Sequence, residues 1–341
     1  MLKLFAFIKI VLFKKIPAVL IIIISVAAVW IMRYFPIMNK PQAIPMIPNT
    51  NLSVCDDKLR MIRNDDYSLT KPLLLVDIPS ESQELSQIKT QIESEIAREK
   101  ESGRINAASV YLRQQNGGHW ISVNGSETFS PGSLIKVPVL ITYLKLAEQN
   151  PAWLTKEITF IPREKIPVQT FNEKAIVPGK KYTVKELLHF MIAYSDNNAT
   201  YLLNENLDIG AFTKLFTDVG LNIPNVRDTG YKITAVEYSR FFRILYNSSY
   251  LTPEHSDFAL NLLTQTTFNK GIVNPLPSTL KVAHKFGETG TKTTHQLHET
   301  AIVYNGTNPY LLTIMTKGDN VDILPEVISN ISNIVYKAEA Q

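Results

Sequence analysis

The spacing of apolar residues divides the chain into three stretches. Residues 16–32 are an uninterrupted run of uncharged, mostly apolar side chains. Residues 36–79 contain several prolines and show little periodicity, which is typical of a semi-extended spacer. From Ser80 onward, apolar residues recur at helical or strand spacing. We therefore predict one folded domain over residues 80–341.

The first stretch predicts a membrane anchor. A helix over residues 16–32, rising about 1.5 Å per residue, reaches the lower limit for crossing the apolar core of a bilayer. Lys9, Lys14 and Lys15 precede it, so the positive-inside rule leaves the N-terminus in the cytoplasm. A cleaved secretory signal is the alternative, and it also exports the domain. We expect residues 1–35 to be a cytoplasmic stub and transmembrane anchor, with the domain extracytoplasmic, at the cell surface or in the periplasm.

The domain begins with a predicted helix and a hairpin. Ser80 and Gln83 have the spacing of a capping box. The apolar face of the helix that follows is formed by Leu85, Ile88, Ile92 and Ile96. Residues 107–114 and 119–123 are rich in β-branched and aromatic side chains and flank an Asn-Gly turn, which predicts two antiparallel strands.

Helical signals dominate the middle of the chain and strand signals return near its end. Capping patterns occur at Thr183, Thr234 and Thr252, the last with Pro253 at the first helical position. Further strands are expected at residues 281–286, 300–304 and 310–316, before a final helix over residues 325–337. We predict an α+β fold: a five-stranded antiparallel sheet flanked by N- and C-terminal helices, with an inserted all-helical lobe and a cleft between the two.

Charge and cysteine content exclude several classes. The net charge is +4, yet the first 35 residues hold five basic and no acidic residues, so the remainder has 30 basic and 31 acidic residues. No basic stripe indicates nucleic-acid binding. The single Cys55 excludes a disulfide framework and a cysteine-rich metal site. His295-x-x-His298 lacks the order of zinc peptidase motifs, so we expect no metal. We also expect no cofactor and a monomeric protein.

The first candidate for chemistry is a Ser-x-x-Lys pair. The pattern occurs four times, but only Ser133 and Lys136 follow a Pro-Gly turn and enter a strongly apolar segment. A buried lysine loses its charge easily and can accept a serine proton. The helix N-terminus favours a developing oxyanion. Pro138 should bend the helix or loosen its first turn. A capped core helix with a solvated lysine is the alternative interpretation.

Two further motifs acquire meaning in combination. Ser195-Asp196-Asn197 follows an amphipathic segment, and alone it would be an ordinary polar helix end. Lys285 lies between apolar neighbours on a predicted strand, where it needs a salt bridge or a bound carboxylate. Gly287, two residues later, permits a close backbone approach.

The order Ser-x-x-Lys, Ser-Asp-Asn and Lys-x-Gly resembles that of class A β-lactamases and other penicillin-recognising serine enzymes, over about residues 80–338. The resemblance implies that Ser133 is acylated by a β-lactam or a D-Ala-D-Ala-type peptide and that Lys136 is its base. Ser195 would pass a proton to the leaving nitrogen. Asn197 would hold the substrate amide, and Lys285 its carboxylate.

The third motif departs from the family pattern. The resemblance implies an oxyanion hole formed by the N–H groups of Ser133 and Glu288, beside Gly287. Phe286 stands where the family has a serine or threonine that binds the substrate carboxylate. Thr289 is the candidate replacement for that hydroxyl.

The second departure concerns deacylation. Class A enzymes use a glutamate on a loop after the second motif to activate water. Residues 198–233 contain only Glu205, Asp208, Asp218 and Asp228 as acids, and the expected loop pattern is missing. We therefore expect efficient acylation and slow deacylation. The alternatives are an active β-lactamase with another water-activating group and a catalytically inactive module that binds the cell wall.

Overall fold

The computed structural model describes residues 59–64, 66, 68–162, 170–171, 174–224, 230–291 and 293–340. The expected anchor and the first part of the expected spacer lie outside these ranges. None of the helices within them has the length and hydropathy of a membrane span.

A five-stranded antiparallel sheet organises the domain, as the sequence predicts. Its strands are β3 (Ala107–Gln114), β4 (Trp120–Val123), β7 (Val282–Gly290), β8 (His295–Val303) and β9 (Tyr310–Gly318). Their spatial order is β4-β3-β9-β8-β7. β7 and β8 are longer than expected and form a hairpin that extends to the cleft, because residues 287–290 and 295–299, beyond the expected strands, continue the ladder.

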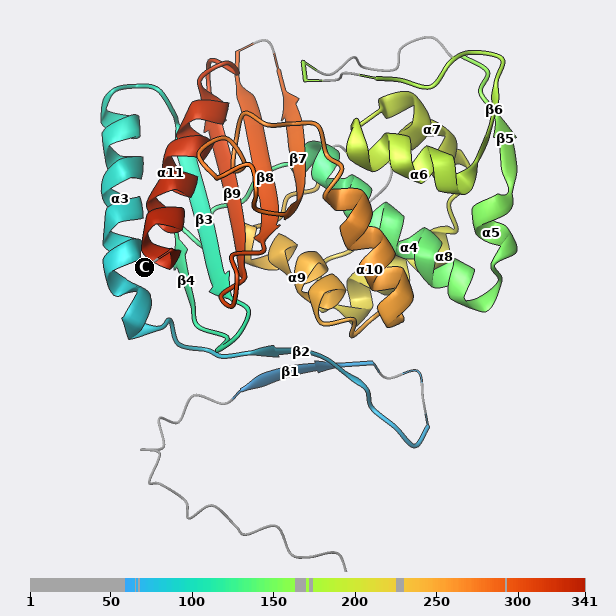
Figure 1. Cartoon of the computed structure of the whole chain (residues 1–341), viewed down its shortest axis with the longest axis horizontal. Helices are drawn as coiled ribbons and strands as arrows, with labels where there is room; N and C mark the ends of the chain where they lie inside the picture. Colours follow the sequence, from blue (N-terminus) through green and yellow to red (C-terminus); the bar gives the residue numbers. More distant parts are fainter. Residues whose placement is uncertain are drawn as a thin grey trace, which may run out of the picture. The chain divides into compact units, whose positions relative to one another are not determined.

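Two helices cover one face of this sheet. α3 (Ser86–Glu101) and α11 (Leu324–Glu339) pack on it in Figure 1. Ile92 and Ile331 are fully buried there against Leu312 of β9. The predicted helical face is therefore confirmed, but its cap is not. A short 3-10 turn, Gln83–Leu85, precedes α3, and α3 has Leu85 at its N-cap with no side-chain cap, so Ser80 and Gln83 do not form the expected capping box.

The helical lobe lies beyond β7, and a second apolar core fills it (Figure 1). Its helices are α4 (Lys136–Gln149), α5 (Ala152–Thr155), α6 (Val184–Ala193), α7 (Asn197–Glu205), α8 (Ile209–Asp218), α9 (Ala235–Tyr246) and α10 (Pro253–Leu263). A small ribbon of β5 (Glu157–Thr159) and β6 (Lys181–Thr183) joins α5 to α6. Thr183, Thr234 and Thr252 cap α6, α9 and α10 as predicted.

The end of the expected spacer is part of the packed domain. β1 (Arg60–Arg63) and β2 (Leu73–Asp77) form an antiparallel ribbon. The side chain of Leu75 is buried in the core of the helical lobe. Arg243 of α9 donates hydrogen bonds to the Asp77 carboxylate (2.5 Å) and to the Val76 carbonyl (2.7 Å). The spacer interpretation is therefore wrong for residues 60–77, where a four-residue apolar run supplies enough buried area to hold the ribbon.

Candidate active site

The nucleophile candidate lies on a tight turn at the entrance to α4. Residues Gly132–Ile135 form a 3-10 turn, and α4 begins at Lys136. Pro138 is the third residue of α4, so its missing N–H falls in the first turn, where no intrahelical partner exists. The proline is therefore accommodated without the loss of a helical hydrogen bond. The Ser133 side chain is buried, with 6% of its surface exposed.

β7 passes so close to this turn that glycine is required on both sides. A Cβ atom on Gly287 would lie 2.6 Å from the Pro131 carbonyl oxygen and 2.8 Å from the Leu134 nitrogen. Gly132 has φ +52°, and its Cβ would lie 2.5 Å from the Glu288 carbonyl oxygen. The close approach expected at Gly287 is therefore present, and it brings the backbone of Glu288 beside Ser133.

Lys136 has the environment of a lysine base. Its side chain is 2% exposed. Nζ donates to the Ser195 carbonyl oxygen (2.5 Å), to Ser195 Oγ (3.0 Å) and to Asn197 Oδ1 (2.8 Å). Burial lowers the pKa of Lys136 from 10.5 to about 7, and the negative charge of Asp196 opposes this shift. At neutral pH a large fraction of this amine can accept a proton.

Ser195 joins the two lysines. Its Oγ accepts hydrogen bonds from Lys136 and also from Lys285 Nζ (2.9 Å), and its side chain is fully buried. With both interactions made as an acceptor, the Ser195 proton remains available for transfer toward the cleft. The residue has φ +54°, a conformation that costs about 1–3 kcal/mol in a non-glycine residue.

Asp196 holds the strained turn at Ser195. Its carboxylate caps α7 by accepting from the N–H groups of Asn198 (3.0 Å) and Ala199 (3.3 Å). It also accepts from the N–H of Ile176 (2.9 Å), which ties α7 to the preceding segment. Burial raises the pKa of Asp196, while these three donors act in the opposite direction. Asp196 is therefore a positioning residue.

Lys285 is fully buried beside an aromatic ring. Its Nζ donates to the Phe286 carbonyl oxygen (2.8 Å) and lies 4.2 Å from the centre of the Phe286 ring. Burial, followed by the positive charge of Lys136, moves the pKa of Lys285 well below its usual value. The Phe286 ring stacks on Phe268 at 4.4 Å and meets Phe171 edge-on. Phe286 thus packs beside the ammonium group and is absent from the described residues that line the cleft.

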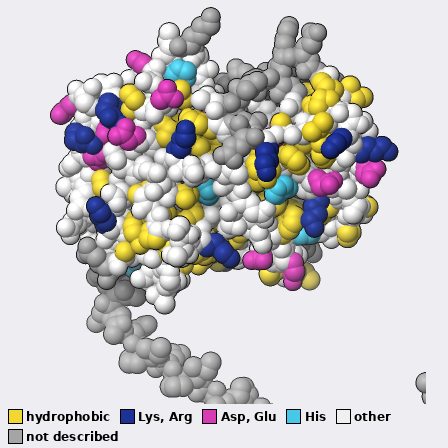
Figure 2. Space-filling view, turned by 45° about the horizontal axis from the view of Figure 1, so that its top comes forward, with side chains coloured by type: hydrophobic (Ala, Val, Ile, Leu, Met, Phe, Trp, Pro, Cys, Tyr) yellow, Lys and Arg dark blue, Asp and Glu magenta, His cyan; other side chains and the backbone are white. Residues whose placement is uncertain are grey.

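The cleft itself has a volume of 520 Å³ and brings together the candidates from all three motifs. Ser133, Lys136, Asn197, Glu288 and Thr289 line it, and Ser195 and Lys285 adjoin it through the hydrogen bonds above. Glu288 contributes its backbone on this side, because its carboxylate accepts from the N–H (3.0 Å) and the hydroxyl of Thr170. On the face shown in Figure 2, acidic and basic side chains are interspersed.

Two residues of β8 that sequence reasoning did not place hold the turn before Ser133, the nucleophile candidate. Gln296 Oε1 accepts from the Ser130 N–H (3.0 Å), and His298 Nε2 donates to the Ser130 carbonyl oxygen (3.0 Å). His298 Nδ1 accepts from the Thr316 N–H (3.3 Å). Burial lowers the pKa of His298 to about 4, so the ring is neutral. Strand alternation is the signal for this role, because His298 and Gln296 share a face with their cross-strand partners, Gly287 and Thr289 respectively.

The acids considered for deacylation are placed elsewhere or engaged. Asp208 caps α8 through the Ala211 N–H, and Asp218 pairs with Lys214. Glu205 accepts a hydrogen bond from the Tyr201 hydroxyl (2.7 Å). Asp228 lies outside the described residues. Within those residues, no group of three or more histidine, cysteine or acidic side chains is arranged to hold a metal ion.

Together, the fold and the cleft that Ser133 and Lys136 both line define a serine hydrolase of the β-lactamase type. The chain belongs to the β-lactamase enzyme family, whose sequence profile matches residues 87–338. A search of curated protein sequences finds no significant match.

Solved structures support the fold assignment. A variant of PBP-A in an acyl-enzyme complex with penicillin G has a TM-score of 0.62 and 21% identity, covering 74% of this chain and 96% of that one. A β-lactamase from Chitinophaga pinensis has a TM-score of 0.65 and 19% identity, covering 74% and 99%. An ancestral class A β-lactamase has a TM-score of 0.63 and 24% identity, covering 74% and 100%.

Proposed function

We propose that this chain is a membrane-anchored, exported serine hydrolase that forms an acyl-enzyme at Ser133 and releases it slowly. The acyl donor is a β-lactam or the D-Ala-D-Ala-type amide of a peptidoglycan stem peptide. The observation that best supports this proposal is the buried Lys136. It lines the same cleft as Ser133 and donates to three hydrogen-bond acceptors.

Acylation uses each motif once. Neutral Lys136 accepts the Ser133 proton while Ser133 Oγ attacks the carbonyl carbon. The amine then becomes an ammonium with three protons, one for each of its three acceptors. The N–H groups of Ser133 and Glu288 hold the oxyanion, a contribution worth about 10²–10³ in rate for each donor. The carbon–nitrogen bond breaks as Ser195 gives its proton to the leaving nitrogen and recovers one from Lys136.

Deacylation has weaker support within the described residues. Asp208 and Asp218 are engaged at helix ends, and Glu205 is bonded to Tyr201. Without a positioned base, water attacks the Ser133 ester slowly. The PBP-A variant solved with penicillin G attached is an acyl-enzyme on the same fold, which agrees with a covalent intermediate here.

The alternatives make different demands on Lys136. An inactive cell-wall-binding module has no use for a lysine that is 2% exposed, because burying an amine costs free energy without contributing to binding. An active β-lactamase with another water-activating group requires the same acylation machinery and differs only in the lifetime of the adduct.

Location and assembly complete the proposal. The apolar run at residues 16–32, with basic residues before it, supports a single anchor with the domain outside the cytoplasm. We propose a monomer that reaches its substrate at the outer side of that membrane.

Covalent labelling tests the function. We expect a fluorescent penicillin to label the detergent-solubilised full chain, and Ser133→Ala to abolish the label. Ser86→Ala removes a serine from another Ser-x-x-Lys pair, on the exposed side of α3, and should label normally. Labelling that persists in Ser133→Ala would exclude Ser133 as the nucleophile.

The lifetime of the adduct separates slow release from true β-lactamase activity. After excess penicillin is removed, we expect the label on Ser133 to persist for many times the duration of one acylation event. Rapid turnover of a chromogenic cephalosporin would instead show that another group activates water.

A further inference from the structure

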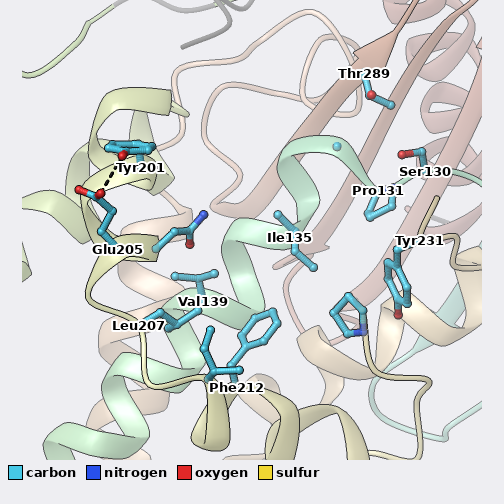
Figure 3. A pocket seen from close by; sticks show the side chains of 14 residues that line it. Ser130, Pro131, Ile135, Val139, Tyr201, Glu205, Leu207, Phe212, Tyr231 and Thr289 are labelled. Atoms are coloured by element: carbon cyan, nitrogen blue, oxygen red, sulfur yellow. Dashed lines mark hydrogen bonds between the residues drawn. The ribbon is translucent and has the colours of Figure 1, made fainter. Parts of the chain in front are cut away.

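A second cavity, of 660 Å³, adjoins the cleft, and Figure 3 shows it from close by. Gly132, Ile135 and Thr289 line both cavities, so the two spaces meet at the turn that carries Ser133. The second cavity lies between that turn, α4, α7 and the start of α8. Its volume suits a drug-sized group. We call it the basin.

The described walls of the basin are mainly apolar. Val139, Leu207 and Phe212 lie side by side below Ile135 in Figure 3. Ile209 lines the basin and has 45% of its side chain exposed. The acidic side chain of the described wall, Glu205, is hydrogen-bonded to the Tyr201 hydroxyl. An apolar group bound here would lose water contacts on several sides.

The direction of β7 indicates which half of a substrate reaches the basin. Lys285, which would bind the substrate carboxylate, is four residues before Thr289. At about 3.3 Å per residue these positions are about 13 Å apart along the strand. The leaving-group carboxylate belongs at the Lys285 end, so Thr289, at the other end, does not fit the carboxylate-binding role that the sequence suggests for it. The acyl half, which stays on Ser133, therefore extends toward Thr289 and the basin.

We propose that the basin binds an apolar alkyl or aryl group on the acyl half of the substrate, so that the enzyme selects acyl donors with such a group. This inference rests on the proposed acylation of Ser133. It assigns a specificity role to Leu207 and Ile209, two residues outside the catalytic motifs. A small or strongly polar acyl group would leave the basin filled with water and gain nothing from it.

The test compares acylation rates for penicillins that share one nucleus and differ only in the acyl chain. We expect the full chain to react at least about tenfold faster with an octanoyl than with an acetyl derivative. Leu207→Gln makes the wall polar, and Leu207→Trp reduces the volume while keeping it apolar. Both should bring the rate ratio close to one. Leu69→Gln is the matched control on an exposed leucine, 96% exposed, and should keep the native ratio.

The outcomes separate the two levels of the proposal. If neither penicillin labels Ser133 in the native chain, the proposed function fails. If both label it at similar rates, or if both Leu207 variants keep the native ratio, the function stands and the basin inference is overturned. If the Leu207 variants do not fold, Ile209→Gln, at a half-exposed position that tolerates polar side chains, replaces them. It should likewise bring the ratio of the octanoyl to the acetyl rate close to one.

Discussion

The proton-accepting role of Lys136 makes a quantitative prediction about pH. A lysine with the ordinary pKa of 10.5 is neutral in only about three molecules in ten thousand at pH 7. With a pKa of about 7, about half of the molecules hold the neutral amine. The fraction of enzyme ready to accept the Ser133 proton is thus about a thousandfold larger.

The acylation rate should follow this fraction. Between about pH 5 and about pH 7, we expect the second-order rate constant for penicillin labelling to rise nearly tenfold per pH unit, and to level off above. Lys136→Arg keeps a cation in place but cannot lose its proton, and should reduce acylation by about a thousandfold or more. Lys89→Met, on the surface of α3, should leave the profile unchanged.

A second substitution tests the sign of the electrostatics. The Asp196 carboxylate raises the pKa of Lys136, so Asp196→Asn should move the midpoint to lower pH, by up to about one unit. Asparagine can also cap α7, which helps to preserve the fold. Stopped-flow fluorescence across the pH range measures both effects. A profile that is flat from pH 5 to 9, or a midpoint near that of free lysine, would refute the reasoning.

Two further predictions concern the residues that position the nucleophile. Gly287→Ala places a Cβ 2.6 Å from the Pro131 oxygen, so we expect acylation to fall at least about tenfold and the urea midpoint to decrease; unchanged labelling would show that β7 can move away at little cost. The pKa of His298 is about 4 in the fold and 6.5 ordinarily, so the unfolded chain binds more protons between those values and the free energy of unfolding should rise across that window, by up to about 3 kcal/mol. Urea denaturation of the native chain and of His298→Gln measures this, and an identical pH dependence in the two would contradict it.

The sequence predicts the sheet and the caps of α6, α9 and α10 well because local patterns specify them, whereas the cap expected at Ser80 does not form. Threonine with glutamate three residues later caps α6 and α9 whatever surrounds those helices. The β1–β2 ribbon is different, because its place depends on the distant Arg243, which binds Asp77. No short-range pattern in residues 60–77 reveals that partner.

The candidate site likewise contains residues that local motifs reveal and residues whose roles depend on distant contacts. Three motifs identify Ser133, Ser195 and Lys285, but the order of motifs does not show how two lysines share one serine oxygen. The sequence also does not reveal that His298 holds the Ser130 carbonyl, since this hydrogen bond depends on how β8 faces Ser130. The motif does not say where the Phe286 side chain lies; its position beside Phe268 follows from aromatic packing that a single motif does not encode.

The shared Ser195 oxygen has a consequence for how the empty enzyme behaves. Two amines are sequestered within reach of one atom, and protonating either one makes protonating the other harder. A bound anion offsets the repulsion between the two lysine charges. The folded protein is therefore more stable with the cleft occupied than with it empty. Occupancy of the cleft by any well-fitting carboxylate should therefore raise the melting temperature, even when no bond to the enzyme forms.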